Sequence, residues 1–270
     1  MTELDARVAQ TWIYPVKSLQ GTRVESLDVR LHGVKGDRNW ALFDLDAGKV
    51  LSAKRLGRIF DGFFDDDSIV LPDGTRLPMT ECVNGGVCDP ISEWLGRPIR
   101  VCSVDDIAEL GDGHLTYQMT FDPPNDDSEY YDIPMPEGSF VDLAPLHMLT
   151  TATLHGCRSA RPDLNWDVRR FRPNILVDVD GEMFLESQWQ GRPIRIGDDL
   201  VIEVAQGTVR CAMPLRRQPA LDADNPELDR QPELYQAMVD LRPEMPNHLG
   251  VYVNVLEPGT VRVGDQLSFV

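Results

Sequence analysis

The sequence lacks several patterns that would assign it to a common class at once. Its five cysteines are Cys82, Cys88, Cys102, Cys157 and Cys211. No two of them form a C-x-x-C pair, so neither a zinc knuckle nor a thioredoxin-type redox pair is predicted. No run of apolar residues approaches the length of a membrane span. The opening residues, MTELDARVAQ, carry no secretory signal pattern. We therefore expect a cytoplasmic protein with no membrane contact.

Positive charge is also scarce. The chain has 26 Lys and Arg against 44 Asp and Glu, which gives a formal net charge of −18. Such a surface repels phosphate backbones and anionic lipids, so nucleic acid is not an expected partner. A small anion would have to be held by cations that are gathered in one pocket, against the field of the rest of the protein.

The 270 residues suffice for one large domain or two modest ones. Short β-branched and aromatic runs such as NWALFDL and LVIEVAQ recur between turn signals, which predicts strands. The stretch IRIGDDLVIEV predicts a hairpin with its turn at residues 197–199. Helices are predicted at Asp89–Gly96, capped by Asp89, at Ala144–Gly156, and at Asn225–Leu241 with a break at Pro232. The expected fold class is mainly β with a few helices (α+β), with a barrel-like first part.

Two further segments carry weaker signals. Residues 104–140 are acidic and proline-rich, which predicts a long surface loop or linker, either a plain solvated insertion or a docking site for a positively charged partner. Cys82 and Cys88 flank a turn containing NGG. They are interpreted as small, half-buried thiols, and a disulfide between them is the alternative.

Four stretches combine a cation with a tight backbone feature at the edge of a predicted strand. They are YPVKSLQG, GVKGDRNW, RRFRPNI and GTVRCAM, and their cations are Lys17, Arg38, Arg172 and Arg210. Each cation alone is typical of a solvated or ion-paired side chain. Together, in an acidic chain, they favour a phosphate site, because arginine binds phosphate with two parallel hydrogen bonds and lysine adds a point charge.

Neutral groups in the same stretches extend this interpretation. Ser18 and Asn174 are hydrogen-bonding side chains beside the cations. Cys211 directly follows Arg210, and a thiolate is a ligand that soft metals prefer. The mixture suits a phosphorylated heteroaromatic cofactor that carries a metal, although an ordinary buried thiol remains the alternative for Cys211.

At this point the sequence resembles a known family. The stretches YPVKS, GDRNWALFD, LHMLTTATL, FRPNI, GRPIRIGD, RC and GVYVNVLEPGTVRVGD follow one another as in MOSC (molybdenum cofactor sulfurase C-terminal) domain proteins with an N-terminal β-barrel domain. The mitochondrial amidoxime-reducing component and its bacterial relatives belong to this group. The resemblance implies an N-terminal MOSC β-barrel domain at 1–122, packed on a MOSC β-barrel domain at 123–270.

The resemblance also implies a site. Cys211 matches the cysteine that ligates molybdenum in the molybdenum cofactor (Mo-molybdopterin). Other residues match positions that contact the pterin and its phosphate, namely Lys17, Ser18, Arg38, Thr150, Thr151, Arg172, Asn174 and Arg210.

The activity implied is a two-electron reduction of N-hydroxylated or N-oxygenated small molecules, with electrons from a separate flavin or iron–sulfur reductase. One alternative is a non-catalytic carrier of the molybdenum cofactor or of sulfur, and another is an interaction domain that has lost its cofactor. The stretch AMPLRRQPALDAD after Cys211 departs from the family's threonine-rich turn, so the substrate-facing wall is not specified by the resemblance.

Overall fold

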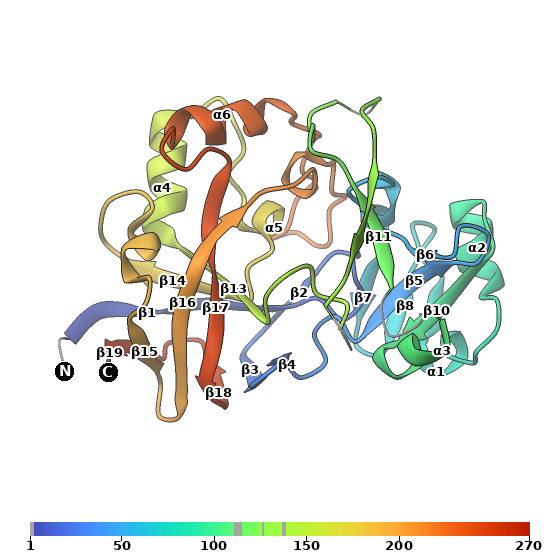
Figure 1. The fold of residues 1–270 in the computed structure, drawn as a ribbon, viewed down its shortest axis with the longest axis horizontal. Helices are drawn as coiled ribbons and strands as arrows, with labels where there is room; N and C mark the ends of the chain where they lie inside the picture. Colours follow the sequence, from blue (N-terminus) through green and yellow to red (C-terminus); the bar gives the residue numbers. More distant parts are fainter. Residues whose placement is uncertain (1–2, 111–114, 126, 137–138) are drawn as a thin grey trace.

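The larger part of the fold is a closed β-barrel built from strands at both ends of the chain. The computed structural model describes residues 3–110, 115–125, 127–136 and 139–270. One sheet has the strand order β14-β13-β17-β16-β15-β19-β1-β2, and a further pairing of β14 with β1 closes it into the barrel (Figure 1). Its strands are β1 Glu3–Ile13, β2 Thr22–Val24, β13 Leu146–Thr150, β14 Ile175–Val179, β15 Pro193–Ile196, β16 Leu200–Val209, β17 His248–Glu257 and β19 Gln266–Phe269.

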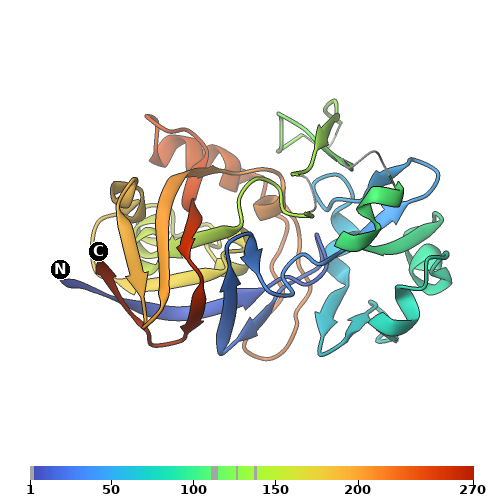
Figure 2. The same ribbon diagram turned by 60° about the horizontal axis from the view of Figure 1, so that its bottom comes forward.

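The first strand belongs to this barrel although it opens the chain. β1 pairs antiparallel with both β14 and β19, and the two termini lie close together at one end of the barrel (Figure 2). The predicted mainly β class is confirmed, as is the β15–β16 hairpin with its turn at residues 197–199. The domain division at residues 122 and 123 stays a prediction.

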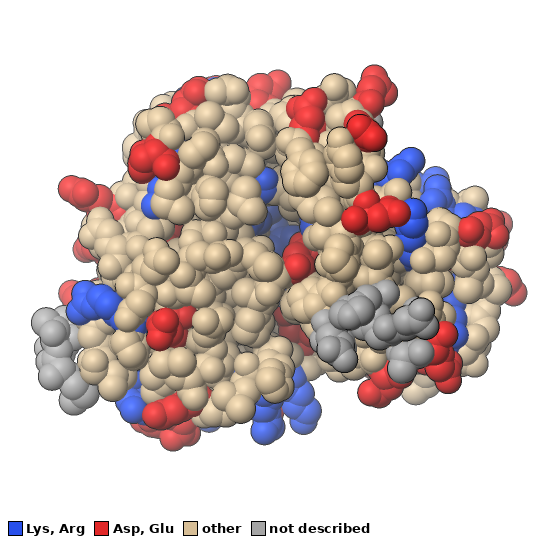
Figure 3. Space-filling view, in the orientation of Figure 1, with Lys and Arg blue, Asp and Glu red and all other residues tan. Residues whose placement is uncertain are grey.

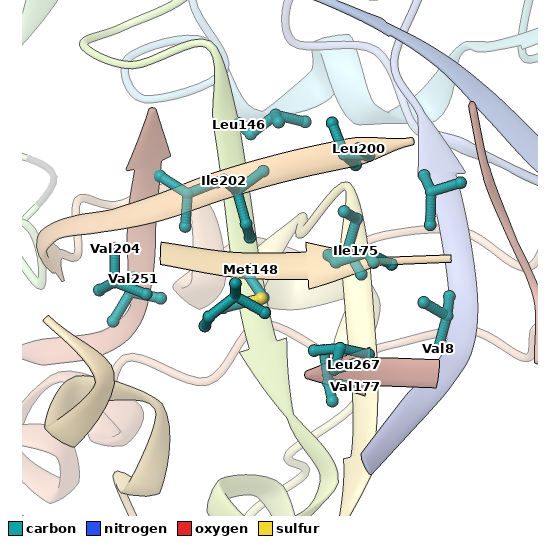
Figure 4. Close-up of a cluster of buried hydrophobic side chains, with 14 of the residues drawn as sticks. Val8, Leu146, Met148, Ile175, Val177, Leu200, Ile202, Val204, Val251 and Leu267 are labelled. Carbon is teal, nitrogen blue, oxygen red and sulfur yellow. The ribbon is translucent and has the colours of Figure 1, made fainter. Parts of the chain in front are cut away.

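The barrel interior is filled with branched aliphatic side chains. Alternate residues of β16, namely Leu200, Ile202 and Val204, point inward, as the two-residue period of a strand requires. They meet side chains from β1, β13, β14 and β17, of which Figure 4 labels Val8, Met148, Ile175 and Val251. Burial of this apolar surface is the main source of the barrel's stability, at roughly 25 cal/mol per Å².

The second part of the fold comprises smaller sheets and short helices. A five-stranded sheet has the order β10-β5-β6-β11-β12, and a three-stranded sheet has the order β7-β8-β9. A further three-stranded sheet, β18-β3-β4, packs Leu27, Val29 and Val261 against the core of the barrel. These strands are β3 Ser26–Arg30, β4 Gly33–Val34, β5 Trp40–Asp44, β6 Lys49–Val50, β7 Phe63–Asp65, β8 Ser68–Val70, β9 Arg76–Pro78, β10 Ile99–Ser103, β11 Thr116–Met119, β12 Tyr131–Pro134 and β18 Gly259–Arg262. A separate apolar cluster around Ile59, Phe60 and Ile91 forms the core of this part.

The helices differ from the predictions at several ends. The α-helices are α1 Met79–Cys82, α2 Asp89–Leu95, α3 Ile107–Leu110, α4 Thr151–Ala160, α5 Val168–Phe171 and α6 Glu233–Leu241, and the 3-10 helices are η1 Gly57–Asp61, η2 Val104–Asp106, η3 Leu185–Trp189 and η4 Met213–Leu215. The helix predicted over Ala144–Gly156 is wrong in its first half, which is the fully buried strand β13. A continuous apolar strand and one face of a helix share the same short pattern, which explains the error.

Two other helix predictions hold only in part. The helix predicted over Asn225–Leu241 begins only after Pro232, where the break was predicted. Asp89 lies inside α2 rather than at its cap. The capping position is Cys88, which provides no side-chain hydrogen bond, and the helix ends at Gly96 in the left-handed conformation.

The described part of residues 104–140 is not an unstructured linker. Among the described residues of this segment, β11 and β12 form an antiparallel hairpin that joins the five-stranded sheet through β6, while 111–114, 126 and 137–138 lie outside the described residues. Pairing and the burial of Tyr117 overcome the acidic, proline-rich composition. The possible docking role of this segment stays a prediction.

The cysteines and the helices bear on two further expectations. All five cysteines are free thiols, and the sulfurs of Cys82 and Cys88 lie 3.9 Å apart, which is longer than a disulfide bond of about 2.05 Å. Both side chains are buried rather than half-buried. No helix within the described ranges has the length and apolarity that crossing a membrane requires.

Candidate functional site

A cavity of about 510 Å³ lies between the barrel and the β11–β12 hairpin. Seven of the nine residues predicted for the site line it, namely Lys17, Ser18, Arg38, Arg172, Asn174, Arg210 and Cys211. Figure 3 shows the hollow between the two parts, with Lys and Arg atoms at its floor and an acidic side chain at its edge. The structure therefore brings together residues that are almost 200 positions apart in the sequence.

The cations reach the cavity because each one lies where a regular element ends or is about to begin. Lys17 lies shortly after β1, and its backbone N–H donates to the Trp40 carbonyl over 2.8 Å. Arg38 lies just before β5, and Arg172 is the first residue after α5. Arg210 and Cys211 follow β16 directly. Loop residues next to strands and helices from both halves of the chain therefore line one cavity.

The backbone around the cavity is held in an uncommon conformation. Six non-glycine residues of the described chain have positive φ, and four of them line this cavity. They are Ser18 (71°), Arg38 (49°), Arg172 (53°) and Asn247 (59°). The left-handed region costs a residue with a Cβ roughly 1–2 kcal/mol, so the surrounding structure enforces these conformations. Such clustering is typical of functional sites.

Tyr14 is a platform for two of the arginines. The guanidinium of Arg172 lies 4.2 Å and that of Arg38 lies 4.8 Å from the centre of its ring. Its hydroxyl donates to the Pro173 carbonyl over 3.0 Å. Gly21 is required beneath the ring, because a Cβ there would lie 2.2 Å from a Tyr14 carbon. Burial raises the pKa of Tyr14 although both arginines oppose this shift, so the ring stays neutral.

Fixed hydrogen bonds orient the arginines. Arg38 pairs with Asp37, whose other oxygen accepts from the Tyr14 N–H over 2.6 Å. Arg172 donates to the Leu19 carbonyl over 2.7 Å. Burial lowers the pKa of Arg172 to about 10, and Arg38 adds to this lowering. Charge is thus concentrated at the cavity floor at an electrostatic cost.

Arg210 has one buried side-chain nitrogen without a hydrogen-bond partner among the described residues. One of its terminal nitrogens donates to the Phe171 carbonyl over 2.8 Å, while its Nε is buried without a hydrogen-bond partner. The side-chain amide of Asn247 fixes the backbone by donating to the Arg210 carbonyl over 2.5 Å. A buried guanidinium with an unpaired donor is costly, so the packing around Arg210 holds this side chain beside the cavity at the expense of stability.

Two lysines share one carboxylate on the wall of the cavity. Asp142 lies 2.6 Å from the Lys17 nitrogen and 2.9 Å from the Lys54 nitrogen. Both ammonium groups lie near the Tyr117 ring, at 4.8 Å and 4.1 Å from its centre. Burial lowers the pKa of Lys17 to about 8, and although Asp142 opposes this, Lys54 and Arg38 add to it. The pKa of Lys54 is raised instead, since Asp142 and then Cys211 outweigh its burial.

Cys211 differs from the other cysteines in its exposure. It is half-buried, whereas Cys82, Cys88, Cys102 and Cys157 are buried. Burial raises the pKa of the Cys102 and Cys157 thiols to about 12, so these two remain protonated. Cys211 is therefore the one cysteine that the cavity makes available to a ligand.

Thr150 and Thr151 do not join the other seven residues. The Thr150 hydroxyl donates to buried Glu186 over 2.7 Å and caps α4, and the Thr151 hydroxyl donates to Asp178 over 3.2 Å. Both side chains are engaged at the junction of β13 and α4, and neither lines the cavity. Their position at the start of α4 accounts for the two adjacent threonines in MLTTATL, because threonine is favoured at helix N-caps.

Sequence reasoning missed several residues of the site. Lys54, Tyr117, Asp142 and Tyr252 all line the cavity. Lys54 had the same signal as Lys17, a cation just past a strand, but AKRLGR resembles a solvated run. Nothing in the sequence distinguishes Asp142 from the other 43 acidic residues of the chain. In the described chain the cavity is lined by five Lys or Arg side chains and one carboxylate, in a protein of net charge −18.

Comparison with known proteins identifies two family models on the chain. The MOSC N-terminal beta barrel domain matches residues 5–60, and the MOSC domain matches residues 136–268. The second match contains β13 to β19, Arg172, Asn174, Arg210 and Cys211, and the first contains Lys17, Ser18, Arg38 and Lys54.

Similar whole proteins are also known. The chain is 23% identical to mitochondrial amidoxime-reducing component 1 of Mus musculus over 285 residues, which covers 96% of this chain and 80% of that protein. It is 24% identical to the Homo sapiens protein of the same name over 292 residues, with 96% and 81% covered. Among solved structures, the YuaD protein of Bacillus subtilis aligns over 97% of this chain and 93% of its own, with a TM-score of 0.43 and 12% identity.

Proposed function

Because the chain belongs to the MOSC-domain proteins, we propose that its cavity holds a molybdenum cofactor and reduces N-hydroxylated or N-oxygenated compounds. One observation carries the proposal: Cys211, the half-buried thiol, lines a cavity whose five cations are gathered in an acidic chain. The names of the amidoxime-reducing relatives support the choice of reaction.

The donor set of the cavity fits this cofactor. The phosphate and the polar pterin edge need cationic and neutral donors, which Lys17, Ser18 and Arg172 offer from a buried floor. Asn174 lines the same floor, but its side-chain amide donates to the Trp12 carbonyl and accepts from the His147 N–H, so it fixes the backbone there. Arg210 lines the same cavity directly beside Cys211 and adds a further guanidinium. Cys211 offers the thiolate that a soft metal prefers.

The reaction consumes two electrons and two protons. When bound, the cofactor supplies the redox centre at which the N–O bond of the substrate is cleaved. An N-hydroxylated amine then becomes the amine plus water, with both electrons coming from a separate flavin or iron–sulfur reductase. The residues of this chain bind and orient the reactants. Lys17, with a pKa of about 8, holds an exchangeable proton on the same wall as Lys54 and Asp142.

An activity assay tests the proposal. Protein from a cofactor-competent host is supplied with a reduced dye and benzamidoxime, and benzamidine is measured. We expect turnover by the wild type and loss of at least about 100-fold in Cys211→Ser, a size typical for losing a group that positions a metal.

Cys88→Ser is the matched control, because Cys88 does not line the cavity and occupies the N-cap position of α2, where serine is favoured. It should keep full activity. No turnover by cofactor-loaded wild type would contradict the reductase. Ready transfer of the cofactor to another apoenzyme, without turnover, would favour the carrier instead.

A further inference from the structure

The mouth of the cavity is apolar although its floor is charged. Phe121, Leu143 and Val209 are 70%, 56% and 56% exposed, and all three line the cavity. They come from three separate segments: the loop after β11, the stretch before β13, and the end of β16. Scattered exposed apolar residues are ordinary, but three around one opening mark a place where another molecule makes contact.

Phe121 lies two residues past the end of β11, among the described residues of the β11–β12 hairpin. Its ring centre lies 5.2 Å from that of Tyr131, and Tyr131 pairs with Met119 across β11 and β12. The hydroxyls of Thr120 and Ser128 are 2.6 Å apart and connect the two sides of the turn. The ring is therefore held at the mouth before any ligand arrives, which reduces the entropy cost of binding.

The two ends of the cavity select for different parts of a ligand. Lys17, Arg172, Arg210 and Cys211 occupy the charged floor, where the cofactor is proposed to lie. A substrate that reaches this floor must pass the apolar mouth, so its reducible N–O group is directed inward and the rest of the molecule stays among Phe121, Leu143 and Val209. Pockets of this kind bind by apolar contact and orient by a few polar groups.

Charge at the outer face of the hairpin narrows the choice. Asp122 and Glu129 are exposed on the same hairpin that carries Phe121, while Asp132 is paired with Lys49 over 2.7 Å. Asp122 and Glu129 disfavour an anionic substrate body, such as a nucleotide, and tolerate a neutral or cationic one.

Resting on the proposed function, we propose that Phe121, Leu143 and Val209 determine substrate specificity. They favour N-hydroxylated compounds with an aromatic or otherwise apolar, non-anionic body over small polar ones.

The kinetic test compares benzamidoxime with acetamidoxime, which share the reacting group and differ in the body. Phe121→Ala and Leu143→Ala should each raise KM for benzamidoxime about five- to tenfold, with kcat nearly unchanged, and should change KM for acetamidoxime less than about twofold. Phe121→Leu should recover most of the loss. Leu256→Ala is the control, because Leu256 is 44% exposed on β17 and lies outside the cavity lining.

A binding test separates this inference from the proposed reaction. Benzamide and acetamide lack the N–O bond, so their dissociation constants for cofactor-loaded protein, measured by ligand-observed NMR, do not depend on turnover. We expect benzamide to bind more tightly than acetamide and Phe121→Ala to reduce the difference by about five- to tenfold. If the wild type reduces both amidoximes and the variants change neither KM nor binding, the inference is overturned while the reductase stands. If Phe121-dependent binding occurs without any reduction, the reductase is overturned and the apolar mouth stands.

Discussion

The barrel interior and the cavity floor are built on opposite principles. In the interior, aliphatic side chains alternate along regular strands, and backbone conformation and burial all favour the same structure. At the floor, four residues have positive φ, arginines are buried beside one another, and the Nε of Arg210 lacks a partner. The interior is arranged for stability. The floor carries strained backbone and buried charge, a cost that the barrel offsets and that fits the proposed binding of a ligand there.

The largest expected effect is the loss of stability when a side chain of the barrel interior is truncated. Ile202 is fully buried in the barrel interior, so Ile202→Ala should lower the free energy of unfolding by about 2–5 kcal/mol. Urea denaturation followed by circular dichroism measures this loss. A loss below about 1 kcal/mol would show that the interior is less tightly packed than the contacts indicate.

The next largest effect is the pH dependence of anion binding at the cavity floor. Lys17 has a pKa of about 8, lowered chiefly by burial, so it is charged below pH 8 and increasingly neutral above it. Affinity of cofactor-free protein for sulfate, which stays a dianion throughout, should therefore fall by up to about tenfold between pH 7 and pH 9.

Lys17→Arg is the matched variant, since its guanidinium stays charged over this range. Isothermal titration calorimetry should find that the decrease above pH 8 is much smaller in this variant. A decrease of the same size in both proteins would assign the pH dependence to another group.

The smallest expected effect is that of a serine-to-glycine substitution on stability, which should differ in sign between a residue with positive φ and a residue in a regular strand. Ser18 has φ of 71°, which glycine adopts without strain, so Ser18→Gly should leave the cofactor-free protein equally stable or up to about 1 kcal/mol more stable. Ser26 begins the regular strand β3, so Ser26→Gly should destabilise by about 0.5–1 kcal/mol. Thermal unfolding of the two variants decides this. Equal destabilisation by both would mean that the Ser18 conformation is not strained.

The sequence predicted the parts of the fold that obey local rules. Strand alternation, the turn at residues 197–199 and the helix break at Pro232 follow from side-chain period and turn chemistry alone. β13 was mistaken for a helix because a fully buried strand has no alternation. The β11–β12 hairpin was missed because its stability comes from pairing with β6, a contact distant in sequence.

As with the fold, the part of the site that could be predicted is the part that has a local signal in the sequence. Lys17, Arg172, Arg210 and Cys211 were found because cations and a thiol stand beside turn signals at strand ends. Thr150 and Thr151 matched the family pattern but serve α4, and no local signal separates a helix cap from a ligand contact. Asp142 could not be identified in advance, since its importance arises from contacts of 2.6 Å with Lys17 and 2.9 Å with Lys54 that only folding creates. Lys54 had the same signal as Lys17, a cation just past a strand, but its neighbours resemble a solvated run.

The most direct measurement of the central claim is the molybdenum and pterin content of protein purified from a cofactor-competent host, for the wild type, Cys211→Ser and Cys88→Ser. We expect about one molybdenum per chain in the wild type and in Cys88→Ser, and a loss of at least about tenfold in Cys211→Ser. Molybdenum absent from the wild type, or equal in all three proteins, would contradict the assignment of the cavity and of Cys211.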